Sequence, residues 1–220
     1  MMRDKRKNEE YFKSYIAYQN ERIEKKVAKL NECNDDAKAG RIRVSLLKYE
    51  LDLLVAEFSA GFDNSKMTVV LNESIDIANK MSNIDYENLL LLLSFSVLLE
   101  KTSSIKTLIA REDRTIKGDS LLNFLAEYLC TKKRMWTNDF QYEKVYGSLK
   151  GLDSNHSNGA VINDYLSSWY DKRKNFSWYE ADKNNNDTYV GYWSFEAAAL
   201  AKIYNLDDAM FIQSEYYPVL

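Results

Sequence analysis

The sequence is poor in residues that break helices and in residues that bind metals. Its 220 residues include one proline, seven glycines, two cysteines and one histidine. A protein built from strands and tight turns uses many prolines and glycines, so their scarcity predicts long helices. One histidine and two cysteines cannot form a zinc site of the usual ligand spacing. We therefore expect an all-α fold without a metal centre.

Common catalytic and cofactor-binding motifs are also missing. There is no glycine-rich phosphate loop, no dinucleotide fingerprint and no Gly-x-Ser-x-Gly nucleophile elbow. His156 lies among Asn, Ser and Gly with no nucleophile motif nearby, which favours an exposed loop histidine. Pro218, the only proline, is followed by Val219, so the Pro-Asp opening of a common nuclease motif is absent. We expect no catalytic residue and no cofactor.

The sequence has no large excess of charge of either sign. It has 30 basic and 33 acidic residues, a net charge of −3 and a pI near 5.4. A nucleic-acid-binding protein usually carries a basic footprint, so direct binding of nucleic acid is not expected. A mildly acidic surface suits a basic protein partner. The oligomeric state is left open, a homo-oligomer included.

No apolar run is long enough to cross a membrane. The longest covers residues 89–99, about half of the ~20 residues that a spanning helix needs. Met1 is followed by a charged segment that lacks the pattern of a secretory signal peptide. A cytoplasmic location is therefore expected. In that compartment Cys33 and Cys130 are expected to be buried free thiols, not a disulfide.

Apolar residues repeat at helical spacing along most of the chain. The stripe expected to face the core in the first helix is Phe12, Ile16, Ile23, Val27 and Leu30. We expect about eight to ten helices packed as a compact array, among them residues 8–31, 41–59, 66–81, 86–101, 104–110, 140–150, 160–174 and 208–213. Two further helices are expected: one after Asp119 with Leu121, Leu125, Tyr128 and Leu129 on one face, and an alanine-rich one with Glu196 in its first turn.

Capping residues mark several helix ends. Gly61 follows the second helix as a left-handed C-terminal cap. Ser65 is expected to be the N-cap of the third helix, and Asp119 that of the helix after a charged stretch, residues 111–118. The charged stretch is expected to separate two domains. These domains are residues 1–110 and 111–220.

The most specific stretch is residues 189–204, where large aromatics lead into a run of alanines with one acid. Its motif residues are Gly191, Tyr192, Trp193, Phe195 and Glu196. Alanine favours helices and lets a neighbouring helix approach closely, so we place this stretch at the centre of the fold. Glu196 has two interpretations. It is an acid catalyst or partner contact, or it is a capping or paired carboxylate beside an N-cap at Ser194, which we favour.

Acidic residues beside aromatics form the candidate contact surface. Trp178 and Tyr179 precede an asparagine-rich loop that carries Glu180, Asp182 and Asp187. Aromatic and acidic side chains together are typical of binding hot spots for a basic partner. A solvated loop without a partner is the alternative interpretation.

An ordered set of motifs resembles a known family. The set is Trp169-Tyr170, Trp178-Tyr179, Gly191-Tyr-Trp-Ser-Phe-Glu-Ala-Ala-Ala-Leu-Ala201, Leu206-Asp-Asp208 and Tyr216-Tyr-Pro218. It resembles the C-terminal signature of the PoNi immunity proteins, which protect bacteria against secreted polymorphic nuclease effectors. Ala56-Glu-Phe-Ser-Ala-Gly61 is similar to the Tyr-Ser-x-Gly helix ending of the companion N-terminal domain. Phe58 replaces the expected Tyr, which removes a hydroxyl, and the Asp expected after Pro218 is missing.

The resemblance implies an immunity protein that acts in interbacterial competition. Such a protein binds the basic DNase domain of its cognate toxin in the cytoplasm and blocks it by direct contact, without chemistry of its own. The acidic loop would then cover a basic DNA-binding cleft, with Glu180, Asp182 and Asp187 facing the toxin. The alternatives are a helical scaffold or regulator that binds a non-nuclease protein, and an enzyme that uses Glu196.

Overall fold

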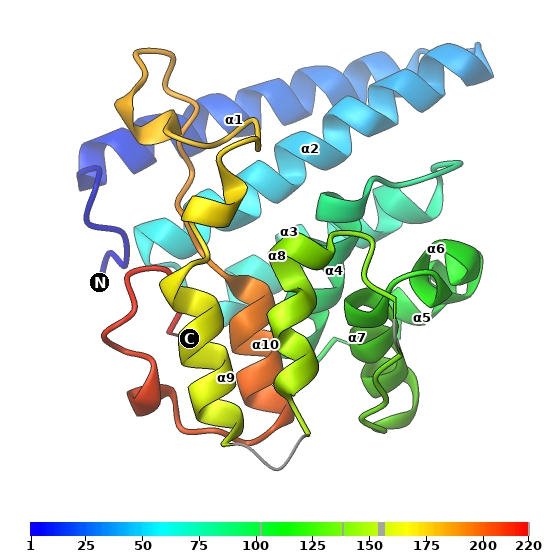
Figure 1. Ribbon diagram of the computed structural model, residues 1–220. Coiled ribbons are helices and arrows are strands. Elements are labelled where there is room, and N and C mark those ends of the chain that lie inside the picture. Colours follow the sequence, from blue (N-terminus) through cyan, green and yellow to red (C-terminus); the bar gives the residue numbers. More distant parts are fainter. Residues whose placement is uncertain (102, 138, 154–156, 220) are drawn as a thin grey trace. The chain divides into compact units, whose positions relative to one another are not determined.

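The computed structural model describes residues 1–101, 103–137, 139–153 and 157–219 (Figure 1). Within these residues the chain forms ten α-helices, four 3-10 helices and no strand, which confirms the all-α prediction. His156 lies outside the described residues. The chain divides into two compact units, which are described separately: Met1–Asn88 with Glu180–Gly191, and Leu89–Tyr179 with Tyr192–Leu220.

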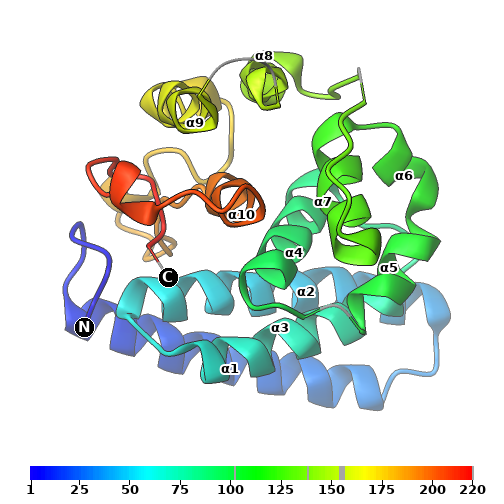
Figure 2. The same ribbon diagram turned by 90° about the horizontal axis from the view of Figure 1, so that it is seen from below.

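Three long helices build the first unit. They are α1 (Glu9–Asn31), α2 (Asp36–Ala60) and α3 (Asn64–Asn79). Helices α1 and α2 run side by side in opposite directions, and α3 packs against α2 (Figures 1 and 2). The loop that returns to this unit carries the 3-10 helix η3 (Ala181–Lys183).

Helix α2 supplies the core of the first unit, as its leucine spacing predicts. Leu47, Leu51, Leu54 and Phe58 are each no more than 2% exposed. The helix begins at Asp36, five residues before the expected start. Asp35 is its N-cap, and the Asp35 carboxylate accepts a hydrogen bond from the backbone N–H of Lys38.

The end of α2 confirms the expected glycine cap. Gly61 has a φ of 87°, and its N–H bonds to the carbonyls of Glu57 and Phe58. The N-terminal segment crosses this turn so closely that a Cβ on Gly61 would overlap the Met1 carbonyl oxygen. Arg3 donates to the Phe58 carbonyl at 2.9 Å and lies over the Phe58 ring.

The buried face of α1 shares only Phe12 with the expected stripe. The residues that are buried are Phe12, Tyr15 and Gln19, whereas Val27 is 39% exposed. A glutamine can occupy this face because its amide donates to the Tyr49 carbonyl of α2 at 2.9 Å. A buried polar residue that is satisfied by a hydrogen bond is invisible to a hydrophobic pattern.

The N-cap of α3 also differs from the prediction. It is Asp63, not Ser65, and its carboxylate accepts from the backbone N–H groups of Ser65 and Lys66 at 3.0 and 3.1 Å. The predicted inward face of α3 is confirmed, because Leu71, Ile75 and Ala78 are fully buried. Residue type alone could not decide between Asp63 and Ser65 as the N-cap, since Asp and Ser are both good N-caps.

The second unit contains shorter helices. Helix α4 (Tyr86–Leu98) starts in the first unit and continues into the second. The other elements of the second unit are α5 (Ile105–Arg111), α6 (Asp113–Lys117), α7 (Ser120–Thr131), α8 (Glu143–Tyr146), η1 (Gly147–Gly151), α9 (Asn158–Ser167), η2 (Asp171–Arg173), α10 (Phe195–Ile203) and η4 (Asp208–Met210).

The charged stretch at residues 111–118 is helical over most of its length. It forms the end of α5 and all of α6, and its Ile116 is 2% exposed. Asp119 is the N-cap of α7, as expected, and accepts from the Leu122 N–H at 2.9 Å. The two compact units divide the chain elsewhere, and the domain boundary at residue 110 stays a prediction.

Cys33 and Cys130 are both free, as expected, but the prediction that both are buried is wrong. Cys33 is half-buried and Cys130 is exposed. Cys130 follows Leu129, whose side chain is buried with Leu125 on the inward face of α7, so Cys130 turns away from that face. None of the helices in the described residues is both long and apolar enough to span a membrane.

Candidate functional site

Glu196 lies at the first turn of α10, in the centre of a buried polar cluster of the second unit. The residue is only 6% exposed. One of its oxygens, Oε1, accepts four hydrogen bonds, from Tyr165 Oη at 2.5 Å, Trp169 Nε1 at 2.7 Å, Ser194 Oγ at 2.9 Å and an Arg173 guanidinium nitrogen at 3.1 Å. The acid is therefore held by α9, the segment after it, and the residue before α10.

Arg173 is the cation of this cluster and is 2% exposed. Its guanidinium donates to the Trp169 carbonyl at 2.8 Å and to the Tyr165 hydroxyl at 2.7 Å, besides pairing with Glu196. Burial lowers the pKa of Arg173, but Tyr165 and Glu196 beside it raise the pKa by more, so the guanidinium stays charged. Burial also raises the pKa of Tyr165 well above its ordinary value, so its hydroxyl keeps the proton that it donates to Glu196.

This geometry agrees with the favoured interpretation of Glu196, a paired carboxylate that fixes the helix. A catalytic carboxylate needs contact with a substrate, whereas Glu196 is buried and its Oε1 already accepts four donors. The expected capping role of Ser194 is not found. Ser194 occupies the N-cap position, but its hydroxyl donates to Glu196 and makes no side-chain bond to the helix backbone.

Arg173 is a residue that the sequence analysis missed. Tyr165, Trp169 and Arg173 are spaced at i, i+4 and i+8, so a continuous helical face would have pointed to it. The chain instead leaves the α-helix at Ser167 and reaches Arg173 in a 3-10 turn, which still directs the guanidinium inward.

Aromatic rings cover this ionic centre and include both predicted contact aromatics. Trp178 and Tyr179 are half-buried. Tyr179 stacks on Tyr170 at 4.5 Å between ring centroids, and Trp178 lies 5.6 Å from Tyr192. Tyr216 stacks almost parallel to Tyr170 at 5.4 Å. Each predicted contact ring therefore packs within the second unit while part of its surface reaches solvent.

The other motif residues are buried or half-buried. Phe195 is 3% exposed and lies 4.3 Å from the Phe95 ring of α4, and Tyr192 is 2% exposed. Trp193 is half-buried. Gly191 has a φ of 128°, a conformation that residues with a Cβ rarely adopt. The alanines of α10 are no more than 3% exposed, so the stretch is core, as its composition predicts.

The asparagine-rich loop in the first unit carries the three predicted contact acids. Glu180 and Asp187 are exposed, and Asp182 is half-buried. Glu180 pairs with Lys183 at 2.8 Å, which offsets its charge. The loop ends at Tyr189, whose hydroxyl donates to the buried carboxylate of Asp4. This hydrogen bond holds the chain in place two residues after Asp187.

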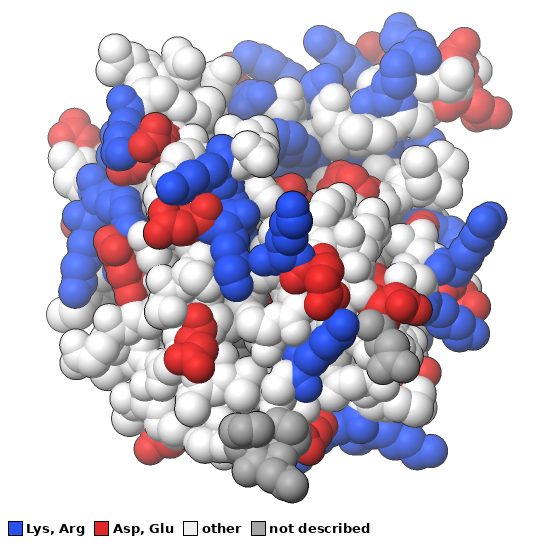
Figure 3. Space-filling view, viewed as in Figure 1, with Lys and Arg blue, Asp and Glu red and all other residues white. Residues whose placement is uncertain are grey.

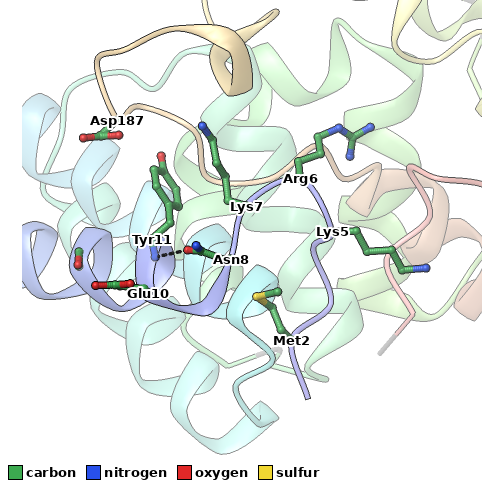
Figure 4. Close-up of a pocket in the computed structure, with 9 residues that line it drawn as sticks. Met2, Lys5, Arg6, Lys7, Asn8, Glu10, Tyr11 and Asp187 are labelled. Atoms are coloured by element: carbon green, nitrogen blue, oxygen red, sulfur yellow. Dashed lines mark hydrogen bonds between the residues drawn. The ribbon is translucent and has the colours of Figure 1, made fainter.

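Asp187 borders a shallow surface hollow of about 820 Å³ at the start of α1 (Figure 4). The hollow is also lined by Lys5, Arg6, Lys7 and Glu10. Basic residues therefore outnumber acids around Asp187, and the loop is not an isolated acidic patch. In the view of Figure 3, side chains of both signs are interspersed over the surface.

Among the described residues, no group of three or more His, Cys, Asp or Glu side chains is arranged to hold a metal ion. In the ionic centre of the second unit, the Glu196 carboxylate pairs with Arg173. Helices, a buried ion pair in the second unit and a cover of partly exposed aromatics together define an all-α protein with a closed ionic centre.

Two family models match the chain and identify the family. The model of the PoNe immunity protein (PoNi), N-terminal, matches residues 3–110, and that of the PoNe immunity proteins (PoNi), C-terminal, matches residues 117–219. The chain therefore belongs to the PoNe immunity protein family, as the resemblance implies. Membership implies an immunity protein directed against a polymorphic nuclease toxin.

A solved structure shares the fold. The crystal structure of protein PA2201 from Pseudomonas aeruginosa matches with a TM-score of 0.66 and 19% sequence identity, over 83% of this chain and 73% of that chain. At this identity the similarity concerns the fold alone. The search of curated proteins found no match.

Proposed function

We propose that the protein neutralises a cognate DNase toxin by binding it directly in the cytoplasm. The observation that carries this proposal is the match of both immunity-protein domain models, over residues 3–110 and 117–219. Direct binding needs no chemistry from this chain. A net charge of −3 also suits the basic surface that a DNA-cleaving enzyme needs for its substrate.

Residues 178–187 are the proposed contact segment. Trp178 and Tyr179 offer partly exposed rings on a packed support, which limits the entropy that they lose on binding. Glu180 and Asp187 are exposed acids in the same stretch of chain. In this proposal the charges speed association with a basic cleft, and the aromatic contacts set the lifetime of the complex.

Co-expression with the nuclease encoded by the neighbouring gene tests the function. We expect the two proteins to co-purify, and we expect the nuclease to lose its cleavage of plasmid DNA as the immunity protein is titrated in. A stable complex in which the nuclease stays active would contradict neutralisation. Cleavage of RNA but not DNA by the free toxin would contradict the DNase assignment. A neighbouring product that is no nuclease would favour the scaffold alternative.

Charge reversal tests the contact segment. The variant E180K/D182K/D187K is expected to raise the Kd for the toxin by roughly tenfold or more, since like charges would then face a basic surface. The matched control is E21K/E24K/D36K, which reverses three exposed acids elsewhere in the first unit. Equal affinity of the loop variant and the wild type would place the interface outside residues 178–187.

A further inference from the structure

Although the net charge of the chain is small, acidic and basic residues are unevenly distributed along the first unit. Residues 50–88 contain eight acids and only two basic residues, Lys66 and Lys80. The rest of this unit, residues 1–49 and 180–191, contains 14 basic residues and 11 acids. The acids of residues 50–88 lie on the second half of α2, on α3, on the loops that flank α3 and, for Glu87, in the first turn of α4.

This acidic α2–α3 face has an exposed layer and a buried layer. Asp63, Glu73 and Asp76 are exposed, at the N-cap of α3 and along it. Glu50 and Glu57 lie seven residues apart on α2, two helical turns, and are only 3% and 7% exposed. The Oε2 atoms of both carboxylates are buried and accept no hydrogen bond from the described part of the chain. A buried carboxylate oxygen without a donor is costly when the acid is ionised, so each acid favours its protonated form unless a positive group comes close.

The charges around these two carboxylates are mostly negative. The pKa of Glu50 is raised to about 7, chiefly by burial and in smaller part by the charges of Glu73 and Glu57. Burial likewise raises the pKa of Glu57 to about 7, where Asp63 and Glu73 add to the effect and Lys66 opposes it. On the other side of α2, the Arg22 guanidinium of α1 lies 3.8 Å from the Tyr49 ring centre. Lys66 is therefore the counter-charge that acts on Glu57, and the charges that shift the pKa of Glu50 are both negative.

We infer that the acidic α2–α3 face docks a surface of the toxin rich in lysine and arginine, and that docking drives protons off Glu50 and Glu57. The inference rests on the proposed function, which supplies a partner that must be basic in order to bind DNA. Glu73 acts on the pKa of both buried acids and Asp63 on that of Glu57, so a cationic surface that docks at Glu73 and Asp63 would stabilise the ionised form of Glu50 and Glu57. The released protons pass to the buffer, so binding strengthens as the pH rises.

Calorimetric titration of the full-length protein with the purified nuclease domain tests this inference. At pH 7 the binding heat is measured in phosphate and in Tris, whose ionisation enthalpies differ. We expect release of about one proton in total, since two groups with a pKa near 7 are each about half protonated. The Kd is expected to fall by roughly a hundredfold between pH 6 and pH 8, because release of about one proton lowers the Kd about tenfold per pH unit. The variant E50Q/E57Q should bind without releasing these protons.

A surface variant separates docking from proton release. E73K/D76K is expected to raise the Kd at least tenfold and to slow association, whereas the matched control E21K/E24K on α1 should bind within about twofold of the wild type. Circular dichroism shows whether each variant is folded. Wild-type binding without proton release, together with normal binding of E73K/D76K, would overturn this inference alone. Failure of the wild type to bind would overturn the proposed function and this inference with it.

Discussion

At the scale of single residues, the Arg173–Glu196 pair explains how a short alanine helix is fixed in the second unit. Small side chains allow close approach but offer little area for packing against neighbours. The carboxylate at the start of α10 instead accepts from Tyr165 and Trp169 and pairs with Arg173. These bonds hold the helix to the segment at residues 165–173.

The substitution Arg173→Met is predicted to destabilise the protein strongly. It leaves the Glu196 carboxylate buried without its counter-charge, and breaking a buried pair in this way costs about 3–5 kcal/mol. Urea unfolding followed by circular dichroism measures the free energy of unfolding. The double variant R173M/E196L should recover part of the loss, because no charge is then left buried.

The neighbouring Lys174 provides the matched control. Its side chain is 62% exposed and pairs with Asp171 at 3.4 Å. Exposed pairs contribute little, so Lys174→Met should change the free energy of unfolding by less than about 1 kcal/mol. If Arg173→Met had an equally small effect, the ion pair would not be what holds α10.

At the scale of elements, the ends of α2 and α3 show how capping fixes the three-helix unit. Gly61 ends α2 in a left-handed turn beneath the N-terminal segment, and Asp63 starts α3 two residues later. This tight connection sets the course of the chain from α2 into α3. The turn depends on a residue without a side chain at position 61.

Two glycine substitutions, one within α2 and one at its C-cap, are predicted to have opposite effects. Gly61→Ala places a Cβ against the Met1 carbonyl at a φ of 87°, so it should lower the free energy of unfolding by about 1 kcal/mol or more. Gly40→Ala lies within the helix with no heavy atom near the new Cβ, so it should raise that free energy by about 1 kcal/mol. Denaturant unfolding measures both. If Gly61→Ala instead raised the free energy of unfolding, neither the positive φ nor the overlap with Met1 would destabilise the folded state.

Residue spacing and residue type predicted the buried face of α2 and two helix caps. The burial of two polar side chains could not be predicted, because it depends on tertiary contacts. The leucine face of α2, the Gly61 cap and the Asp119 cap follow from spacing and residue type alone. Gln19 is buried because of a carbonyl on another helix, and Arg173 because of a carboxylate 23 residues further along the chain. A pattern of apolar residues carries no record of such partners.

At the scale of the whole molecule, two buried acids are predicted to tie stability to pH. The pKa values of Glu50 and Glu57 are raised in the folded state to about 7, from an ordinary 4.5, chiefly by burial. A raised acid pKa means that the folded state binds more protons than the unfolded state between pH 4.5 and 7. Stability from this source is therefore greatest at the acidic end of that window and is lost as the pH rises through 7.

The free energy of unfolding should fall between pH 5 and pH 8 by at most about 3 kcal/mol for each of the two acids. Urea unfolding at several pH values measures this slope. Burial also raises the pKa of Asp52, which acts in the same direction, so the comparison needs a variant. E50Q/E57Q removes both ionisations with little change of shape, so its slope should be shallower and its stability at pH 8 higher than that of the wild type. Parallel curves for the two proteins would mean that Glu50 and Glu57 ionise as easily in the folded chain as in the unfolded one, because only a pKa difference between the two states produces a slope.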